Sequence, residues 1–227
     1  FSRSLFKATN FRIGIIGNLV ARLGSGAIPF LIPLFLQIGL GFNPVLAGLT
    51  MMPTALGAMG TKLLANWVVT RFGYRPILMI NTLLLGALIA GFSLLGNHTP
   101  YLLLLLYLAI IGVLNSLQFT AMNTLTLGGL EREEASSGNS LLSVVMQLSM
   151  SLGVAVSATL FAWYYGSSAS LQSGPMTGPQ QDEIMFAFHA TFITVGCLSM
   201  LATLIFRQLP SRNTFISSQE EARVIRR

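Results

Sequence analysis

Long apolar stretches alternate with short polar segments along the whole chain, and six of these stretches are long enough to cross a membrane. A helix needs about 20 mainly apolar residues to span the ~30 Å hydrocarbon layer, because each residue adds about 1.5 Å. The pattern therefore predicts an all-α, polytopic membrane protein, built as a bundle of six transmembrane helices. The predicted helices cover residues 13–40, 44–69, 76–95, 101–127, 137–164 and 184–206.

Turn-forming residues separate the predicted helices. Residues 39–44, 71–76 and 96–100 each contain glycine and end in the proline that is typical of the start of a helix. Gly128 and Gly129 end the fourth helix, and residues 166–183 form a predicted loop rich in Ser, Gly, Pro and Gln. Prolines inside the first two helices remove backbone hydrogen bonds and can bend them; these are Pro29, Pro33 and Pro53.

The composition excludes several classes of protein. Charged residues make up 9% of the chain and hydrophobic residues 53%, whereas a typical soluble domain has about 25% charged residues. This argues against a soluble enzyme, a nucleic-acid-binding domain and a disordered chain. Cys197 is the only cysteine, so no intramolecular disulfide or cysteine-based metal site can form. No metal cluster, phosphate-binding glycine loop or nucleophile–base pair stands out, and we expect neither enzymatic activity nor a cofactor.

The positive charges predict the orientation. Of the 13 Lys and Arg residues, all but Arg22 and Lys62 flank the spans. They precede the first helix, follow the sixth, or lie in the loops after the second and fourth; the loops after the first, third and fifth helices hold none. By the positive-inside rule, both termini are cytoplasmic. The predicted organisation is a cytoplasmic segment (1–12), the bundle (13–209) and a cytoplasmic tail (210–227).

Two local motifs carry a family resemblance. Residues 70–76, Thr-Arg-Phe-Gly-Tyr-Arg-Pro, resemble the D-R-x-G-R-[RK] loop of the major facilitator superfamily, which lies between the second and third helices of each six-helix half. Thr70 and Tyr74 depart from that motif, which weakens its charge network. Residues 135–155 resemble the A-S-x-x-N…Q-x-x-x-S-x-G-V-A pattern of the fourteen-helix drug:proton antiporter branch.

The resemblance covers roughly residues 10–210 and implies the C-terminal half of a transporter. The chain begins with Phe1 rather than Met, so we expect an N-terminal portion of six or eight further helices in the same protein. Such transporters have two halves around a central cavity, which opens alternately to each side. The implied function is proton-coupled efflux of drugs or other amphipathic small molecules across a bacterial inner membrane. The implied partners are that substrate, protons and the lipid bilayer.

Two alternatives remain open: a metabolite carrier of the same superfamily, and a non-transporting membrane scaffold or sensor. The six predicted spans contain no Asp or Glu, although a proton-coupled transporter needs a titratable group in the membrane. We therefore expect the coupling acid to lie in the N-terminal portion.

The candidate cavity residues are polar or flexible side chains on the first, second, fourth and fifth helices, which line the cavity in the family. Arg22 and Lys62 lie about 9 residues, or roughly 13 Å, inside the membrane; they either line the cavity or extend their side chains to the cytoplasmic interface. The uncharged candidates either line the cavity or hydrogen-bond between helices. They are Asn18 and Ser25, then Asn115, Gln118 and Met122, and then Ser143, Gln147 and Ser151.

A gating loop is the second predicted feature. Arg71, Gly73 and Arg75 match the family motif of this loop. The predicted topology places them on the same side of the membrane as the acidic residues 131, 133 and 134. One interpretation is a latch that forms in one access state and breaks in the other. The other is that these arginines only fix the topology and contact anionic lipids.

Overall fold

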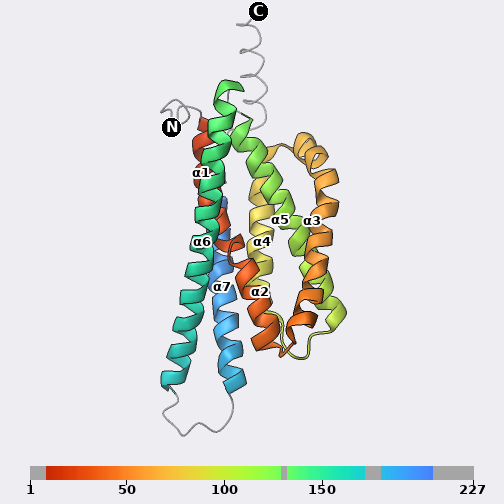
Figure 1. Ribbon diagram of the computed structural model, residues 1–227, viewed down its shortest axis with the longest axis vertical. Coiled ribbons are helices and arrows are strands. Elements are labelled where there is room, and N and C mark those ends of the chain that lie inside the picture. The colour runs from red at the N-terminus through yellow and green to blue at the C-terminus, as the bar shows by residue number, and fades with distance from the viewer. Residues whose placement is uncertain (1–8, 129–131, 172–179, 207–227) are drawn as a thin grey trace, which may run out of the picture.

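The structure, a computed structural model, describes residues 9–128, 132–171 and 180–206 (Figure 1). That part of the chain is helical and contains no strand. Its α-helices are α1 (Thr9–Ser25), α2 (Ile28–Leu34), α3 (Pro44–Phe72), α4 (Tyr74–Gly91), α5 (Tyr101–Leu127), α6 (Arg132–Leu171) and α7 (Gln180–Phe206). A π-helical turn, η2 (Phe35–Gly39), follows α2, and a 3₁₀ turn, η3 (Phe92–Leu94), follows α4. The predicted all-helical fold is confirmed.

Five helical stretches in the described residues are long and apolar enough to cross a membrane. They are Ile15–Gly39, Tyr74–Leu94, Tyr101–Leu127, Ala135–Gly166 and Gln181–Phe206, and they correspond to five of the six predicted spans. The remaining predicted span, 44–69, lies within α3, which is one continuous helix of 29 residues. The side chains of residues 62–67 in α3 lie outside the description, and the predicted terminal segments are largely outside it as well.

The first predicted span is broken rather than continuous. α1 ends at Ser25 and α2 begins at Ile28. Pro29 explains the position of the break, because a proline has no N–H to bond the carbonyl four residues earlier and its ring collides with that carbonyl; here that residue is Ser25. Beyond Pro33 the helix continues as η2, where the amide of Leu40 donates to the carbonyl oxygen of Phe35 at 2.9 Å.

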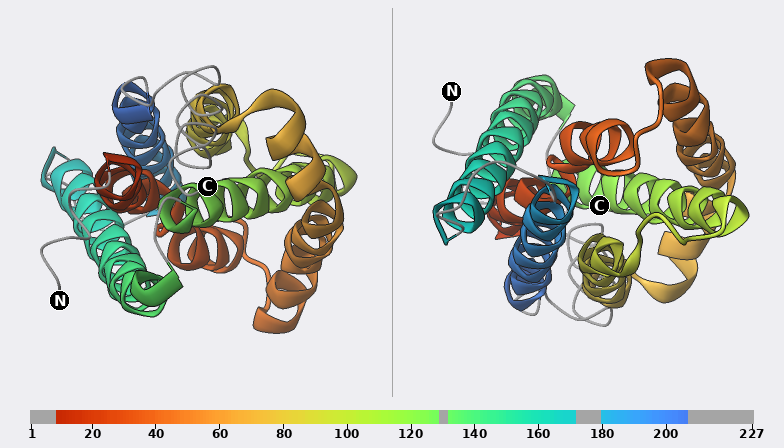
Figure 2. Two further views of the ribbon diagram at one scale, coloured as in Figure 1. Left: turned by 90° about the horizontal axis from the view of Figure 1, so that it is seen from above. Right: turned by 90° about the horizontal axis from the view of Figure 1, so that it is seen from below.

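The long helices lie side by side, and several helix ends meet at one end of the bundle (Figure 1). At that end α1 begins, α3 turns into α4, and α6 begins; α7 also ends there, since the Phe206 ring lies against Gly17 of α1. Seen along the bundle, α5 crosses the centre, with α3 on one side of it and α1, α6 and α7 on the other (Figure 2). α3 packs along α5, α4 along α7, and α1 against both α6 and α7.

Glycines allow the closest helix crossings. A Cβ at Gly112 of α5 would collide with the backbone of Thr54 in α3. Gly26, at the break between α1 and α2, lies against the backbone of Met150 in α6, and Gly153 faces the carbonyl oxygen of Leu23. Small residues bring membrane helices together because apolar lipid provides no hydrophobic driving force for their association. The α1–α6 crossing sets which face of α6 is covered.

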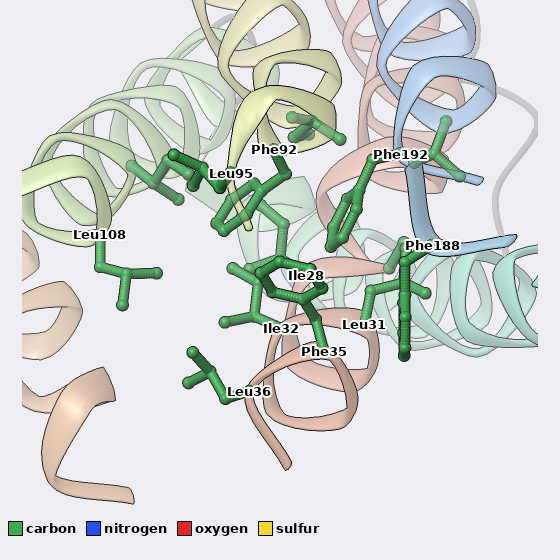
Figure 3. Packing of buried hydrophobic residues seen from close by; sticks show 14 of the residues in the cluster. Ile28, Leu31, Ile32, Phe35, Leu36, Phe92, Leu95, Leu108, Phe188 and Phe192 are labelled. Carbon is green, nitrogen blue, oxygen red and sulfur yellow. The ribbon is translucent and has the colours of Figure 1, made fainter. Parts of the chain in front are cut away.

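Two apolar clusters hold the bundle, one toward each end. In the cluster farther from the start of α1, Phe35 of η2 makes edge contacts with the rings of Phe188 and Phe192 of α7, at centroid distances of 5.5 and 5.6 Å (Figure 3). Phe92 of η3 stacks on Phe192 at 4.8 Å. The second cluster, nearer the start of α1, joins α1, α3, α4, α5 and α7. These clusters fix the helices that carry the candidate site.

Two predicted boundaries of the last loop are wrong. Residues 166–183 were expected to form a loop, but α6 continues to Leu171 and α7 starts at Gln180. Serine and alanine dominate residues 167–170, and a helix that leaves the membrane needs no further apolar residues to continue. At about 1.5 Å per residue, the 40 residues of α6 extend for about 60 Å, well beyond the hydrocarbon layer.

Candidate functional site

Asn18, Arg22 and Ser25 share one face of α1, as predicted from their spacing. The Asn18 side chain is fully buried, and its Oδ1 accepts a hydrogen bond from Nε of Arg22 at 3.1 Å. Arg22 is partly exposed. Its guanidinium carbon lies 4.7 Å from the centroid of the Phe119 ring of α5, a cation–π distance. The Ser25 hydroxyl donates to the carbonyl oxygen of Ala21 within α1.

The structure separates the three candidates on α5. Gln118 is buried and joins α5 to α4: its Oε1 accepts a hydrogen bond from Nδ2 of Asn81 at 2.7 Å, and its Nε2 donates to Oγ1 of Thr82 at 2.7 Å. Met122 is 1% exposed and belongs to the apolar cluster nearer the start of α1. Asn115 is partly buried. Gln118 was expected either to line the cavity or to form hydrogen bonds between helices. The structure shows hydrogen bonds between α4 and α5.

The three candidates on α6 lie on an exposed face. Ser143, Gln147 and Ser151 are all exposed, and together with the exposed Ser140 they form what we call the α6 polar stripe. The Ser143 hydroxyl donates to the carbonyl oxygen of Asn139 in its own helix. The covered face of the same helix carries Leu142, Ser149, Gly153 and Ser157, which are all buried.

The helix that carries the α6 polar stripe packs against α1, which carries Arg22. The two helices cross where Gly26 meets Met150, and Met150 stands one residue from Ser151. From the same α1 helix, Arg22 reaches Phe119 of α5. The structure thus brings Arg22 onto Phe119, packs α1 against α6, turns Gln118 toward α4, and buries Met122 in the apolar cluster.

The predicted gating loop is shorter than its sequence suggested. α3 continues through Arg71 to Phe72, and α4 begins at Tyr74, so that a single residue separates them. That residue is Gly73, with φ +84° and ψ 160°, and its amide donates to the carbonyl oxygen of Val69 at 2.9 Å. Arg71 in the last turn of α3 complements the negative end of the helix dipole.

Two sets of predicted site residues lie outside the described side chains. One is Lys62, whose backbone belongs to α3. The other comprises the acidic side chains at 131, 133 and 134, the predicted counterparts of Arg71 and Arg75 in a latch. Both the cavity role of Lys62 and the latch stay predictions.

Sequence reasoning missed Asn81 and Thr82. They lie in α4, and both are buried; Nδ2 of Asn81 also donates to the carbonyl oxygen of Leu114 at 2.9 Å. Their signal was an adjacent pair of polar residues inside an otherwise apolar run. Among the described residues, no group of three or more His, Cys, Asp and Glu side chains is placed to hold a metal ion.

Comparisons with known proteins agree with this architecture. The model of the Major Facilitator Superfamily matches residues 14–226. The chain is 42% identical over 225 residues to "Putative multidrug resistance protein MdtD" of Cronobacter sakazakii, and 40% identical over 225 residues to the protein of that name from Escherichia coli O1:K1. These alignments cover 98% of the chain and 46% of each relative, so the chain spans about half their length. The protein of that name from Klebsiella pneumoniae strain 342 is 44% identical over 212 residues, which are 92% of this chain and 43% of the relative. The chain therefore belongs to the major facilitator superfamily, a family of membrane transporters rather than enzymes.

Proposed function

We propose that this chain is the C-terminal half of a secondary active transporter that exports drugs or other amphipathic small molecules. The α6 polar stripe is the observation that carries the proposal. The Ser140 and Ser143 hydroxyls donate to carbonyl oxygens within α6, but lipid cannot satisfy the exposed amide of Gln147, so this part of a membrane-spanning helix must face water or another part of the protein. A solute pathway between two halves supplies such a surface. The relatives with multidrug resistance in their names support efflux.

Two other features fit the proposed pathway. Phe119 is 42% exposed, and flexible or aromatic side chains beside a few polar groups suit the binding of varied apolar solutes. Gln147 and Ser151 are exposed amide and hydroxyl groups that orient a solute without selecting a fixed charge.

The experiment compares two glutamines changed in the same way. In the full-length transporter, Gln147→Leu removes an exposed amide from the stripe, whereas Gln118→Leu removes a buried amide that binds Asn81 and Thr82. We expect Gln147→Leu to change the relative efflux rates of a panel of dyes severalfold with little change in thermal stability. Gln118→Leu should lower stability by about 1 kcal/mol, the typical value for such hydrogen bonds in membranes, and leave the substrate profile unchanged. The reverse pattern would contradict the proposal.

Proton coupling is the remaining part of the proposal, with the coupling carboxylate in the N-terminal half. The acidic side chains that the structure describes are Asp182 and Glu183, both in the first turn of α7. Efflux driven by an imposed pH gradient, measured in proteoliposomes, should become independent of the gradient when the intramembrane acids of the N-terminal half are changed to amides. Coupling that survives all those changes would exclude this location.

A further inference from the structure

Arg22 is a cation within a predicted membrane span, and it has no anionic partner among the residues that the structure describes. In the part of the chain that the structure describes, its one hydrogen bond is to Asn18 and its one ring contact is to Phe119. It lies seven residues, or about 10 Å, inside the span that starts at Ile15. A charged group at that depth is costly and is retained where it pairs or faces water. Arg22 is partly exposed, so its charge either faces water in the pathway or pairs with an anion from outside these helices.

The contacts of Arg22 leave one edge of the guanidinium open. Asn18 engages Nε, and the aromatic ring covers a face of the group. The two terminal nitrogens have no partner among the described residues. A guanidinium with its terminal N–H groups free is suited to a carboxylate, which accepts two parallel hydrogen bonds.

Asn18 fixes this orientation. Its Nδ2 is buried and has no hydrogen-bond partner among the described residues, and leaving a buried amide donor unsatisfied destabilises a fold. Turning the amide over would bring this donor against the donor Nε of Arg22. The amide is thus held with its oxygen toward the guanidinium, and it acts as a positioning residue for Arg22.

We propose that Arg22 binds the carboxylate of the transported molecule, so that the substrates of this transporter include amphipathic organic anions. The proposal rests on the proposed efflux function and names its substrate class. Phe119 provides the adjacent apolar surface for the body of the molecule, since 42% of it is exposed, and the neighbouring α6 polar stripe provides a route along the membrane. The same carboxylate chemistry could come from an acidic side chain in the N-terminal half, and the experiment separates these sources.

The test measures the binding of two probes with the same body. 1-Pyrenebutyrate carries a carboxylate, and 1-pyrenebutanol is its neutral counterpart. Dissociation constants are measured by fluorescence with the purified full-length transporter in nanodiscs. The variants are Arg22→Gln, which removes the charge; Arg22→Lys, which keeps it without the bidentate geometry; and Asn18→Asp, which gives Arg22 an internal carboxylate. Lys7→Gln removes a positive charge before the first span and serves as the control.

We expect Arg22→Gln and Asn18→Asp each to weaken 1-pyrenebutyrate binding about tenfold or more, since charge-assisted hydrogen bonds are lost. Binding of 1-pyrenebutanol should change less than twofold, Arg22→Lys should be intermediate, and Lys7→Gln should match the parent. Asn18→Asp keeps the cation paired, so it tests the site even if Arg22→Gln does not fold.

Four results would overturn the inference. An unchanged ratio of the two dissociation constants in both variants would show that Arg22 does not bind the carboxylate. Restoration of a defective Arg22→Gln variant by neutralising an acid of the N-terminal half would assign the anion to the protein itself. Efflux of neutral probes with no preference for the anion would refute the substrate class and leave the efflux function standing, whereas a protein that moves neither probe nor any cationic dye would refute both.

Discussion

Two glutamines show how the surroundings of a residue, rather than its type, determine its role. Gln118 and Gln147 both lie in apolar membrane-spanning helices. The first is 6% exposed and forms hydrogen bonds with Asn81 and Thr82 across the α4–α5 contact. The second is exposed. A buried amide must find partners within the bundle, so Gln118 joins helices, while Gln147 is available to a solute or to the other half of the transporter.

The same reasoning gives Gly73 a precise role in the loop between α3 and α4. Its φ of +84° is a conformation that an L-residue adopts only with strain. We expect Gly73→Ala to lower the stability of the full-length protein by about 1–3 kcal/mol, measured as a shift in the unfolding midpoint. The control is Gly60→Ala in α3, where a Cβ would meet no atom within 4 Å. It should be neutral or stabilising by about 0.5–1 kcal/mol. Equal effects of the two changes would argue against a conformational role for Gly73.

At the scale of helices, the sequence correctly predicted that the helices exist and that they are α-helical. The reason is that membrane spans have one dominant signal, the length of the apolar run. The fourth predicted helix, 101–127, has the bounds of α5. The break after Ser25 was not predicted. A proline within a helical pattern can either bend the helix or end it, and contacts with neighbouring helices determine which of the two occurs. Here Gly26 packs against Met150 at the break, and this crossing stabilises a separate α2.

The faces of the helices were harder to predict than the helices. Spacing placed Asn18, Arg22 and Ser25 together correctly, since it needs only the helical period. It could not show that Gln118 turns toward α4, because that depends on Asn81 and Thr82, more than thirty residues away. Nor could it separate the exposed stripe of α6 from the buried Ser149 and Ser157, because both faces carry serines.

At the scale of the whole molecule, the charged side chains that the structure describes differ between the two ends of the bundle. Arg71 and Arg75 lie at the turn between α3 and α4, at the end where α1 begins (Figure 1). Asp182 and Glu183 lie in the first turn of α7, at the opposite end. We propose that the basic end faces the cytoplasm, as the positive-inside rule predicts. α1 begins at this end and α7 finishes there, since Phe206 lies against Gly17.

This topology makes a prediction for labelling from one side of the membrane. The one cysteine of this chain, Cys197, is exposed on α7, so it and any cysteine in the rest of the full-length protein are first changed to serine. Asn97→Cys then places a thiol in the connection between α4 and α5, and Ser137→Cys places one near the start of α6; both positions are exposed. A membrane-impermeant maleimide should label Asn97→Cys in intact cells and Ser137→Cys only after permeabilisation. Efflux by each variant provides the control for correct insertion. Labelling of Ser137→Cys in intact cells, with protection of Asn97→Cys, would mean that the basic end faces outward, and the proposed orientation of Arg22 and the polar stripe would have to be inverted.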